Sequence, residues 1–255
     1  MKKIGAIVQI RVDSTRLPKK ALSDILGKPM TLRLLERLQR SELINEIIVA
    51  TTKNKTDDEL VKIVEENNIK IFRGSTEDVL DRYYQAAKQN DIDIIARITG
   101  DCPLVDPEIV DNMIRYFLDN DFDYVSNTIK PTYPDGICVE VFSYKTLEKT
   151  WNEARLMSER EHVTPYITKH PESFNINNFK NNEDLSDLRW TVDEPQDLEF
   201  VREIFNRLYN KKNVFHMRDV LKLLEKNPEL KNINSGIIRN EGYLKSLKDD
   251  KIVKK

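Results

Sequence analysis

Short apolar runs alternate with amphipathic stretches along the first half of the chain, and this alternation limits the possible folds most strongly. The runs are rich in Ile and Val, as expected for strands buried on both faces. The stretches between them place apolar residues three and four positions apart, which is typical of helices. Strands are predicted at residues 4–10, 44–50, 69–72 and 92–98, and helices at 31–39, 56–67, 78–88 and 107–118. The expected fold is therefore α/β, a doubly wound, mainly parallel sheet covered by helices on both faces.

One helix start has a specific signature. Thr56 and Glu59 have the spacing of a capping box, so the helix over 56–67 is expected to begin there.

The second half of the chain is less regular. Strands are predicted at 124–127, 139–142 and 174–179, a strand-like run at 189–192, and helices at 147–155 and 196–209. Residues 124–180 resemble an insertion that leaves the parallel core, to which the chain then returns. At 255 residues the chain is long enough for one elaborated domain. We expect one domain over 1–232 and a polar, lysine-rich, partly ordered tail over 233–255.

Composition excludes several classes of protein. A net charge of −2 argues against a nucleic-acid binder, whose surface would be basic. No stretch approaches the roughly 20 consecutive apolar residues of a membrane span. The two cysteines, Cys102 and Cys138, give neither a disulfide framework nor a zinc spacing. We expect a soluble protein of the cytoplasm that binds no nucleic acid and no membrane.

A basic loop follows the first predicted strand. It carries Arg11, Ser14, Arg16 and Lys20, and the carboxyl end of a parallel strand is where α/β proteins commonly bind ligands. The glycines of a P-loop or of a dinucleotide-binding fingerprint are absent. A phosphate bound here would be held mainly by side-chain cations and loop amides. The alternative is a solvated basic connection without a ligand.

Two aspartates follow strand-like runs at distant places in the chain. Asp101 comes after the strand at 92–98, and Asp193 after the run at 189–192. Carboxylates at such positions suit Mg²⁺, which takes one or two of them together with phosphate oxygens and water. Each could instead form a turn or cap a helix, the commoner role for an Asp in this position. Cys102 is interpreted as a small buried residue, because no orienting His–Asp set accompanies it.

Several motifs together resemble one enzyme family. RVDSTRLPKKALSDILGKPM (11–30), GDCPLVDPEIV (100–110) and RWTVDEPQDL (189–198) resemble, in order, the motifs of the cytidylyltransferases that make CMP-activated acidic sugars. GSTEDVLDRYYQAA (74–87), EREHVTPYI (159–167) and NEGYLKSLKDD (240–250) are similar to the branch of the spore coat polysaccharide biosynthesis protein F. The resemblance implies a Rossmann-like fold, CTP as donor, Mg²⁺ as cofactor, and a homodimer formed through the inserted segment.

The resemblance also implies roles for individual residues. Asp101 and Asp193 match the metal-binding acids. With Arg16 and Lys20, which would hold the β- and γ-phosphates, they form the expected catalytic set. The residues expected to bind the nucleotide are Arg11, Ser14, Arg16, Lys20, Thr51, Asp78, Arg82, Thr99 and Asp101. Asp78 stands where sugar-acid synthetases carry an arginine, and Thr99 where the Kdo enzymes have glutamine. The acceptor would attack the α-phosphorus of CTP, and pyrophosphate would leave.

The candidates for binding the small-molecule acceptor are Glu140, Arg160, Glu161 and His162. His162 could serve as a general base, because its ordinary pKa lies near neutrality. The alternative is that 159–162 forms a helix turn at a subunit interface.

Two other functions stay open on the sequence alone. A nucleotide-sugar-dependent glycosyltransferase would bind its metal through an Asp-x-Asp pair, and residues 91–93, 119–121 and 121–123 fit that pattern. The second possibility is a nucleotide-binding relative that has lost catalysis.

Overall fold

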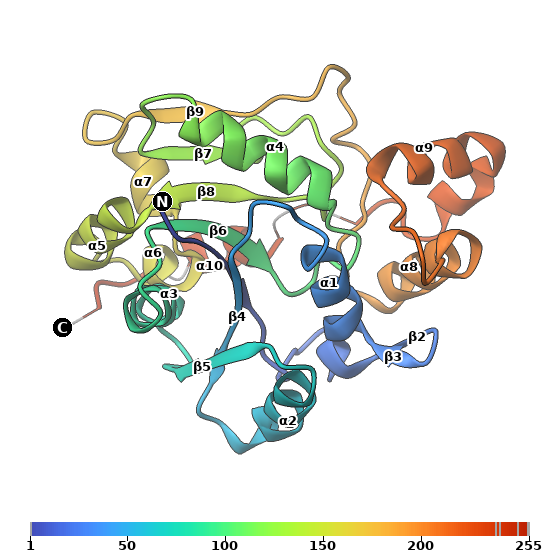
Figure 1. Cartoon of the computed structure of the whole chain (residues 1–255), viewed down its shortest axis with the longest axis horizontal. Coiled ribbons are helices and arrows are strands. Elements are labelled where there is room, and N and C mark those ends of the chain that lie inside the picture. The colour runs from blue at the N-terminus through green and yellow to red at the C-terminus, as the bar shows by residue number, and fades with distance from the viewer. Residues whose placement is uncertain (1, 238, 240, 249, 254–255) are drawn as a thin grey trace.

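The computed structural model describes residues 2–237, 239, 241–248 and 250–253. In this part of the chain, seven strands form one sheet in the order β5-β4-β1-β6-β8-β7-β9 (Figure 1). β8 is antiparallel to both neighbours, and every other neighbouring pair in this sheet is parallel. The strands are β1 (Ile4–Gln9), β4 (Glu46–Thr52), β5 (Lys70–Gly74), β6 (Ile94–Thr99), β7 (Tyr124–Ser126), β8 (Glu140–Ser143) and β9 (Ile176–Asn178). The predicted α/β class is confirmed.

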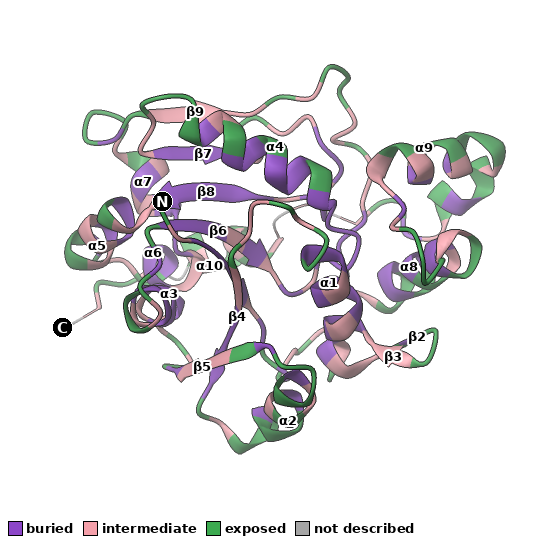
Figure 2. Cartoon of the chain, in the orientation of Figure 1, coloured by how far each residue is buried: buried purple, intermediate pink, exposed green. Residues whose placement is uncertain are grey.

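Helices cover both faces of the sheet. One face packs against α1 (Met30–Leu38), α2 (Asp58–Glu66), α4 (Pro107–Leu118), α8 (Pro195–Leu208) and α9 (Met217–Lys226). The other packs against α3 (Val79–Gln89), α5 (Tyr144–Glu153) and α7 (Pro165–Lys169), and α6 (Met157–His162) packs against α3. The central strands are buried, whereas α2 and α9 expose their outer sides (Figure 2). The two core clusters explain why the apolar runs of the first half lack alternation, since both sides of each strand are covered.

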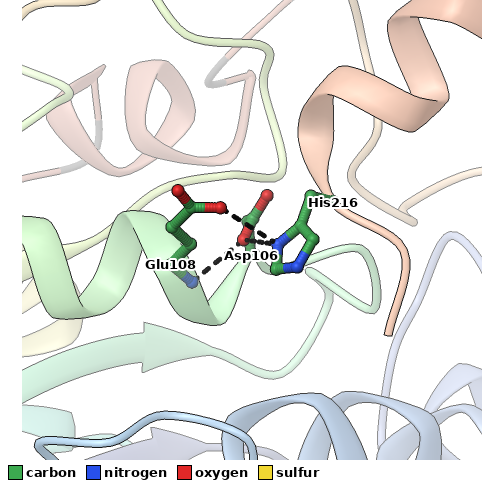
Figure 3. Close-up of side chains that lie close together, drawn as sticks. All are labelled: Asp106, Glu108 and His216. Carbon is green, nitrogen blue, oxygen red and sulfur yellow. Dashed lines mark hydrogen bonds and ion pairs between the residues drawn. The ribbon is translucent and has the colours of Figure 1, made fainter. Parts of the chain in front are cut away.

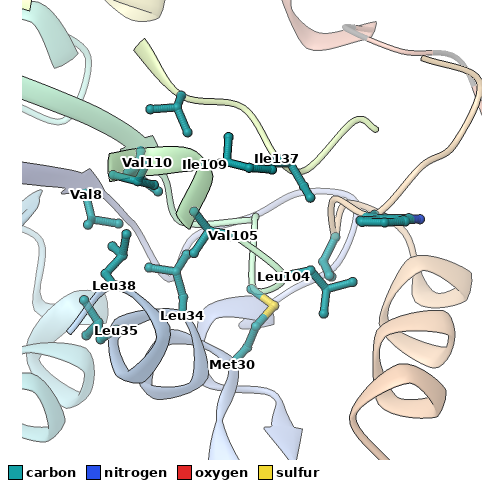
Figure 4. Packing of buried hydrophobic residues seen from close by; sticks show 14 of the residues in the cluster. Val8, Met30, Leu34, Leu35, Leu38, Leu104, Val105, Ile109, Val110 and Ile137 are labelled. Atoms are coloured by element: carbon teal, nitrogen blue, oxygen red, sulfur yellow. The ribbon is translucent and has the colours of Figure 1, made fainter. Parts of the chain in front are cut away.

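The packing of α1 shows how the sequence pattern becomes a core. Met30, Leu34 and Leu38 are completely buried, and they lie against residues of the 104–110 region (Figure 4). Truncating a buried leucine of this kind to Ala typically costs about 2–5 kcal/mol. This packing fixes the loop that connects β1 to α1, and with it the basic residues of that loop.

Two local predictions are corrected. The capping box of Thr56 and Glu59 is wrong: a 3₁₀ turn, η2 (Lys55–Asp57), precedes α2, and the Thr56 hydroxyl donates to Asp13 instead (2.8 Å). Residues 189–192 form no strand within the sheet, and the backbone of Arg189 forms an isolated β-bridge with Asp135.

The remaining elements lie outside the main sheet. A two-stranded ribbon, β2 (Asp24–Ile25) and β3 (Lys28–Pro29), precedes α1, and short 3₁₀ turns occur at η1 (Lys20–Leu22) and η3 (Pro228–Asn232). The region expected to be a polar tail contains α10 (Glu241–Lys248), which packs against α6. None of the described helices is both long and apolar enough to cross a membrane.

Candidate active site

A cleft of about 1230 Å³ opens beyond the carboxyl ends of β1 and β6. The loops after these two strands lie close together, because the Gly100 amide donates to the Gln9 carbonyl (2.9 Å). A Cβ on Gly100 would lie 2.8 Å from that carbonyl oxygen and 2.4 Å from Ile10 Cγ1. Glycine is therefore required at this position for the basic loop and the Asp101 loop to meet.

The two aspartates predicted to bind metal converge on one lysine. The Val192 amide donates to the Asp101 carbonyl (2.8 Å), which joins the loops that carry Asp101 and Asp193. Lys20 Nζ lies 2.8 Å from Asp193 Oδ1 and 3.6 Å from Asp101 Oδ2, and it also donates to the Val192 carbonyl (2.7 Å). Three segments far apart in the sequence thus bring two carboxylates and one ammonium group together.

The charges of this cluster stabilise one another. Burial by itself lowers the pKa of Lys20, but Asp101 and Asp193 outweigh it, and the pKa is raised. Burial likewise would raise the pKa of Asp193, but the charge of Lys20, with those of Arg16 and Arg189, holds it below its ordinary value. Lys20 and Asp193 are therefore both charged at neutral pH.

Arg16 contacts the same cluster from its outer side. Its NH2 lies 2.9 Å from Asp193 Oδ1, and its NH1 lies 3.5 Å from Glu194 and 3.3 Å from Glu241. About a third of the Arg16 side chain is exposed. The guanidinium therefore reaches the cleft while held by acids from two other parts of the chain.

Arg189, which the sequence did not single out, supports Asp193 from behind. It forms ion pairs with Asp135 (3.2 Å), Asp193 (3.1 Å) and the completely buried Asp197 (2.9 Å). Asp197 also accepts hydrogen bonds from the Asp193 and Glu194 amides. The position of Asp193 is thus fixed through both its backbone and its carboxylate.

Asp135 reaches this cluster because of the glycine that follows it. Gly136 has φ +107°, and a Cβ there would lie 2.4 Å from the backbone of Trp190 and Thr191. The Pro-Asp-Gly turn that contains Asp135 could have indicated this close approach, since Gly supplies positive φ at turns. Arg239, also missed, approaches Asp135 Oδ1 (3.7 Å) from the C-terminal region.

Two further cations face the cleft without an acidic partner among the described residues. Arg82 is almost completely buried, its Nε has no hydrogen-bond partner, and its NH1 makes only a long contact to the Ala50 carbonyl (3.4 Å). Burial lowers its pKa, the positive charge of Arg11 adds to that effect, and Asp57 and Asp78, which form no ion pair with it, offset only part of it. A buried, incompletely bonded arginine is unfavourable unless a ligand satisfies it. Arg11 and Arg82 therefore mark a place for an electron-rich group.

The other predicted nucleotide-binding residues divide into two groups. Ser14, Asp78 and Thr99 line the cleft, as Arg11, Arg16, Lys20, Arg82 and Asp101 do. Thr51 does not: it is fully buried, and its hydroxyl donates to Asp57 (2.8 Å). The assignment of Thr51 to the nucleotide is corrected on this ground, because its only polar side-chain atom is used inside the core.

The four predicted acceptor residues all line the cleft, but two are occupied by internal contacts. Glu140 is buried and accepts hydrogen bonds from Arg97, Tyr124 and Thr164. Arg160 is held by Asp78, which it contacts through Nε at 2.7 Å. Asp78 is at the same time the N-cap of α3, accepting from the Asp81 amide (2.9 Å). These two residues build the wall of the cleft and have little freedom to bind a ligand.

Glu161 and His162 face the C-terminal segment, by which we mean the described residues of 239–253. Ser246 Oγ lies 3.0 Å from His162 Nε2 and donates to Glu161 (2.8 Å). Burial lowers the pKa of His162 more than the charge of Glu161 raises it, so this imidazole is neutral at physiological pH. His162 is the last residue of α6, and a neutral imidazole there could accept a proton.

The C-terminal segment completes the cleft. Asp250 accepts from the Ser158 amide (3.0 Å) and hydroxyl (2.6 Å), and Leu156 forms a β-bridge with Ile252. Its side chains, including those of Arg239, Glu241 and Tyr243, line the cavity. The segment is therefore part of the wall of the site, which its polar composition did not indicate.

A second group of possible metal ligands lies elsewhere. Asp106, Glu108 and His216 converge among the described residues (Figure 3). Asp106 accepts hydrogen bonds from the Glu108 and Met217 amides and lies 2.9 Å from His216 Nδ1. The Asp106 carboxylate thus accepts hydrogen bonds at the amino ends of both α4 and α9. The partial positive charge of these two helix ends disfavours a cation there. We interpret this group as structural.

None of the three Asp-x-Asp pairs lines the cleft. Asp93 accepts a hydrogen bond from the Lys3 amide (2.7 Å), and Asp123 accepts one from the Asn175 amide (2.9 Å). The glycosyltransferase alternative therefore lacks its metal site at the place where the fold binds ligands.

The fold and the cleft together define the class of protein. A mainly parallel α/β sheet whose carboxyl edge gathers a lysine, several arginines and two acids from separate loops is built to hold a phosphorylated nucleotide. The sequence comparison agrees: the family model described as cytidylyltransferase matches residues 5–234. The chain belongs to the cytidylyltransferase family and is an enzyme of the nucleotidyltransferase class.

Individual relatives extend over most of the chain. An uncharacterised protein of Methanocaldococcus jannaschii is 40% identical over 245 residues, covering 94% of this chain and 98% of the relative. The spore coat polysaccharide biosynthesis protein SpsF of Bacillus subtilis is 31% identical over 238 residues, covering 90% and 97%. The resemblance to this family that the motifs indicated is thus confirmed.

Solved structures give the same result for the fold. A cytidylyltransferase from Leptospira borgpetersenii superposes with a TM-score of 0.88 at 35% identity, covering 94% of this chain and 100% of that one. A CMP:2-keto-3-deoxy-manno-octonic acid synthetase complexed with CTP gives a TM-score of 0.64 at 20% identity, covering 81% and 99%.

Proposed function

We propose that this enzyme transfers CMP from CTP to a sugar acid or a related acceptor and releases pyrophosphate, with Mg²⁺ as cofactor. The observation that carries the proposal is the convergence of Lys20, Asp101 and Asp193, with Arg16 beside them, at the carboxyl edge of the sheet. A synthetase of similar fold was crystallised with CTP, which supports CTP as the donor. The name of the SpsF relative supports a role in making surface polysaccharide.

Asp101 and Asp193 are suited to hold the metal ion. Their carboxylates come from different loops and face the same nitrogen of Lys20. Mg²⁺ prefers carboxylate and phosphate oxygens, and a distant protein of the same fold was crystallised with manganese. When bound, Mg²⁺ would neutralise part of the charge on the phosphate oxygens of CTP.

The basic residues would position the nucleotide. Lys20 and Arg16 would hold the β- and γ-phosphates and stabilise the leaving pyrophosphate, which requires positioning and charge neutralisation but no covalent intermediate. Arg11 and Arg82, which lack acidic partners among the described residues, would bind another electron-rich part of CTP.

The acceptor would enter between Asp101 and the C-terminal segment. Glu161 and His162 are the candidates to contact it, because they are only half-buried, whereas Glu140 and Arg160 are buried and held by internal contacts. His162, neutral through burial, would accept the proton of the attacking hydroxyl group.

The test measures pyrophosphate release with CTP, UTP, ATP or GTP, each with Mg²⁺ and a panel of sugar acids. We expect turnover with CTP and one or more acids, its loss in Asp101→Ala, and no change in the control Asp119→Ala, an aspartate outside the cleft. Consumption of UDP-sugars without pyrophosphate release would instead favour a glycosyltransferase. Tight binding of nucleotide without turnover on any acceptor would favour a non-catalytic protein.

We also propose that the enzyme acts as a homodimer formed through residues 124–180, as the family resemblance implies. Sedimentation equilibrium tests this directly, and a monomer at all concentrations measured would contradict it. The cytoplasmic location stays a prediction.

A further inference from the structure

A second cavity, of about 380 Å³, lies between α1, the end of α8 and the loop that leads to α9. It shares no lining residue with the cleft. In the part of the chain that the structure describes, four cationic side chains line it, against one acidic side chain, Glu36; the cations are Arg33, Arg37, Arg40 and Lys211. This excess of positive charge has no role in the proposed reaction.

Arg37 is the central residue of this cavity, and only 4% of it is exposed. Its Nε donates to the Val105 carbonyl (2.7 Å), and its NH2 donates to the Phe215 carbonyl (2.8 Å). The guanidinium lies over the Phe215 ring, 4.1 Å from its centroid. Among the described residues no carboxylate forms an ion pair with it. Burial lowers the pKa of Arg37 to about 10, which the more distant Asp106 only partly offsets.

Arg33, one helical turn earlier, provides a contrast. It donates to the Ile25 carbonyl (2.8 Å) and to Glu36 (3.0 Å). Glu36 also pairs with Lys28, so a single acid is shared between two cations. Among the described residues, only the more distant Asp106 offsets part of the charge of Arg37, and a buried charge without a close counterion is unfavourable.

We infer that this cavity binds a small phosphate-type anion, such as inorganic phosphate or pyrophosphate. Arg37 would supply the buried charge, and the exposed side chains of Arg40 and Lys211 would complete the site at its rim. A nucleobase fits less well, because the guanidiniums of Arg33 and Arg37 already cover faces of the Tyr209 and Phe215 rings.

The cavity is connected to the active-site cleft through the backbone. Arg37 donates to the carbonyl of Val105, whose amide donates to the Cys102 carbonyl (3.0 Å). Cys102 directly follows Asp101. A chain of two hydrogen bonds therefore joins Arg37 to the backbone of the loop that carries Asp101.

The experiment is calorimetric titration of the full chain with phosphate and with pyrophosphate, without nucleotide. Anion binding to the second cavity should remain in the variant Lys20→Met, in which anion binding to the cleft is weakened. It should weaken at least about fivefold in the double variant Arg40→Ala/Lys211→Ala, since each exposed charge contributes modestly. Lys212→Ala removes an adjacent exposed lysine outside the cavity and should bind as the wild type does.

Two results would overturn the inference. One is that all phosphate and pyrophosphate binding disappears in Lys20→Met, which would assign it to the cleft. The other is that the double variant binds as tightly as wild type. Neither measurement uses CTP or an acceptor, so failure of the proposed reaction would leave this test unaffected.

Discussion

Replacing Lys20 with Met is the most direct test of the active-site assignment. The ammonium group of Lys20 makes a close ion pair with Asp193 (2.8 Å), a longer one with Asp101 (3.6 Å) and a hydrogen bond to a carbonyl. If Lys20 moves onto the triphosphate during the reaction, its loss removes one electrostatic contact from the transition state, at a cost of about 2.7–4 kcal/mol. At about 1.36 kcal/mol per tenfold change, the rate constant should fall roughly 100- to 900-fold.

The measurement is kcat/KM for pyrophosphate release with CTP and the acceptor identified in the screen. Lys28→Met is the matched control, because it removes the same charge from the neighbouring strand β3, where Lys28 pairs with Glu36 outside the cleft. We expect the control to retain wild-type turnover, and both variants to keep the circular dichroism of the wild type. A Lys20→Met protein with unchanged kcat/KM would refute the role of Lys20 in binding the phosphates.

Three further predictions concern Asp101, Asp193 and Arg189. Asp101→Ala should abolish pyrophosphate release with little change in melting temperature, because the Asp101 side chain is partly exposed and caps no described helix; loss of the folded state would contradict this. The pKa of Asp193 in the folded state is depressed. Its ionisation therefore stabilises the fold at pH values above the unfolded pKa of about 3.9, and this stabilisation is lost as the pH falls through the folded-state pKa. The melting-temperature gap between wild type and Asp193→Asn should therefore be widest near neutral pH and narrow below about pH 4; a constant gap would count against the ion pairs. Arg189→Met should leave the buried Asp197 without its charge partner, at a cost of about 3–5 kcal/mol in the free energy of unfolding. This cost should lower the melting temperature by about 6–20 °C in calorimetry. A shift of a degree or less would show that Arg189 does not hold this cluster.

The fold was predictable because the strands of the first half are buried on both faces. Runs such as 92–98 contain apolar residues on both sides of the strand, which is the pattern of a covered parallel sheet. The details that failed were local. Thr56 has the right spacing for a helix cap, but its hydroxyl donates a hydrogen bond to Asp13, which is distant in the sequence. No pattern within the helix could reveal that contact.

The meeting of Lys20 with Asp101 and Asp193 could be expected because the loops after parallel strands open on one edge of a sheet. The positions of other residues of the site could not be predicted from the sequence. Thr51 lies at the carboxyl end of β4, and the sequence does not show whether its side chain enters the cleft or the core. Arg239 comes from a polar region that is held in place by contacts distant in sequence, such as that of Asp250 with Ser158.

The charges of the cleft bear on how tightly it can bind a nucleotide. Lys20 and Arg16 already contact acids, among them Asp193 and Glu241, so a triphosphate must compete with these carboxylates. The net gain on binding is the difference between two sets of ion pairs, and it is small for Lys20 because its existing pair with Asp193 is largely buried and hardly screened by water. Arg11 and Arg82 have no such competitor among the described residues, and Arg82 is buried with a free Nε. It follows that these two arginines contribute most to nucleotide affinity, whereas Lys20 and Arg16 contribute most where charge develops on the leaving pyrophosphate.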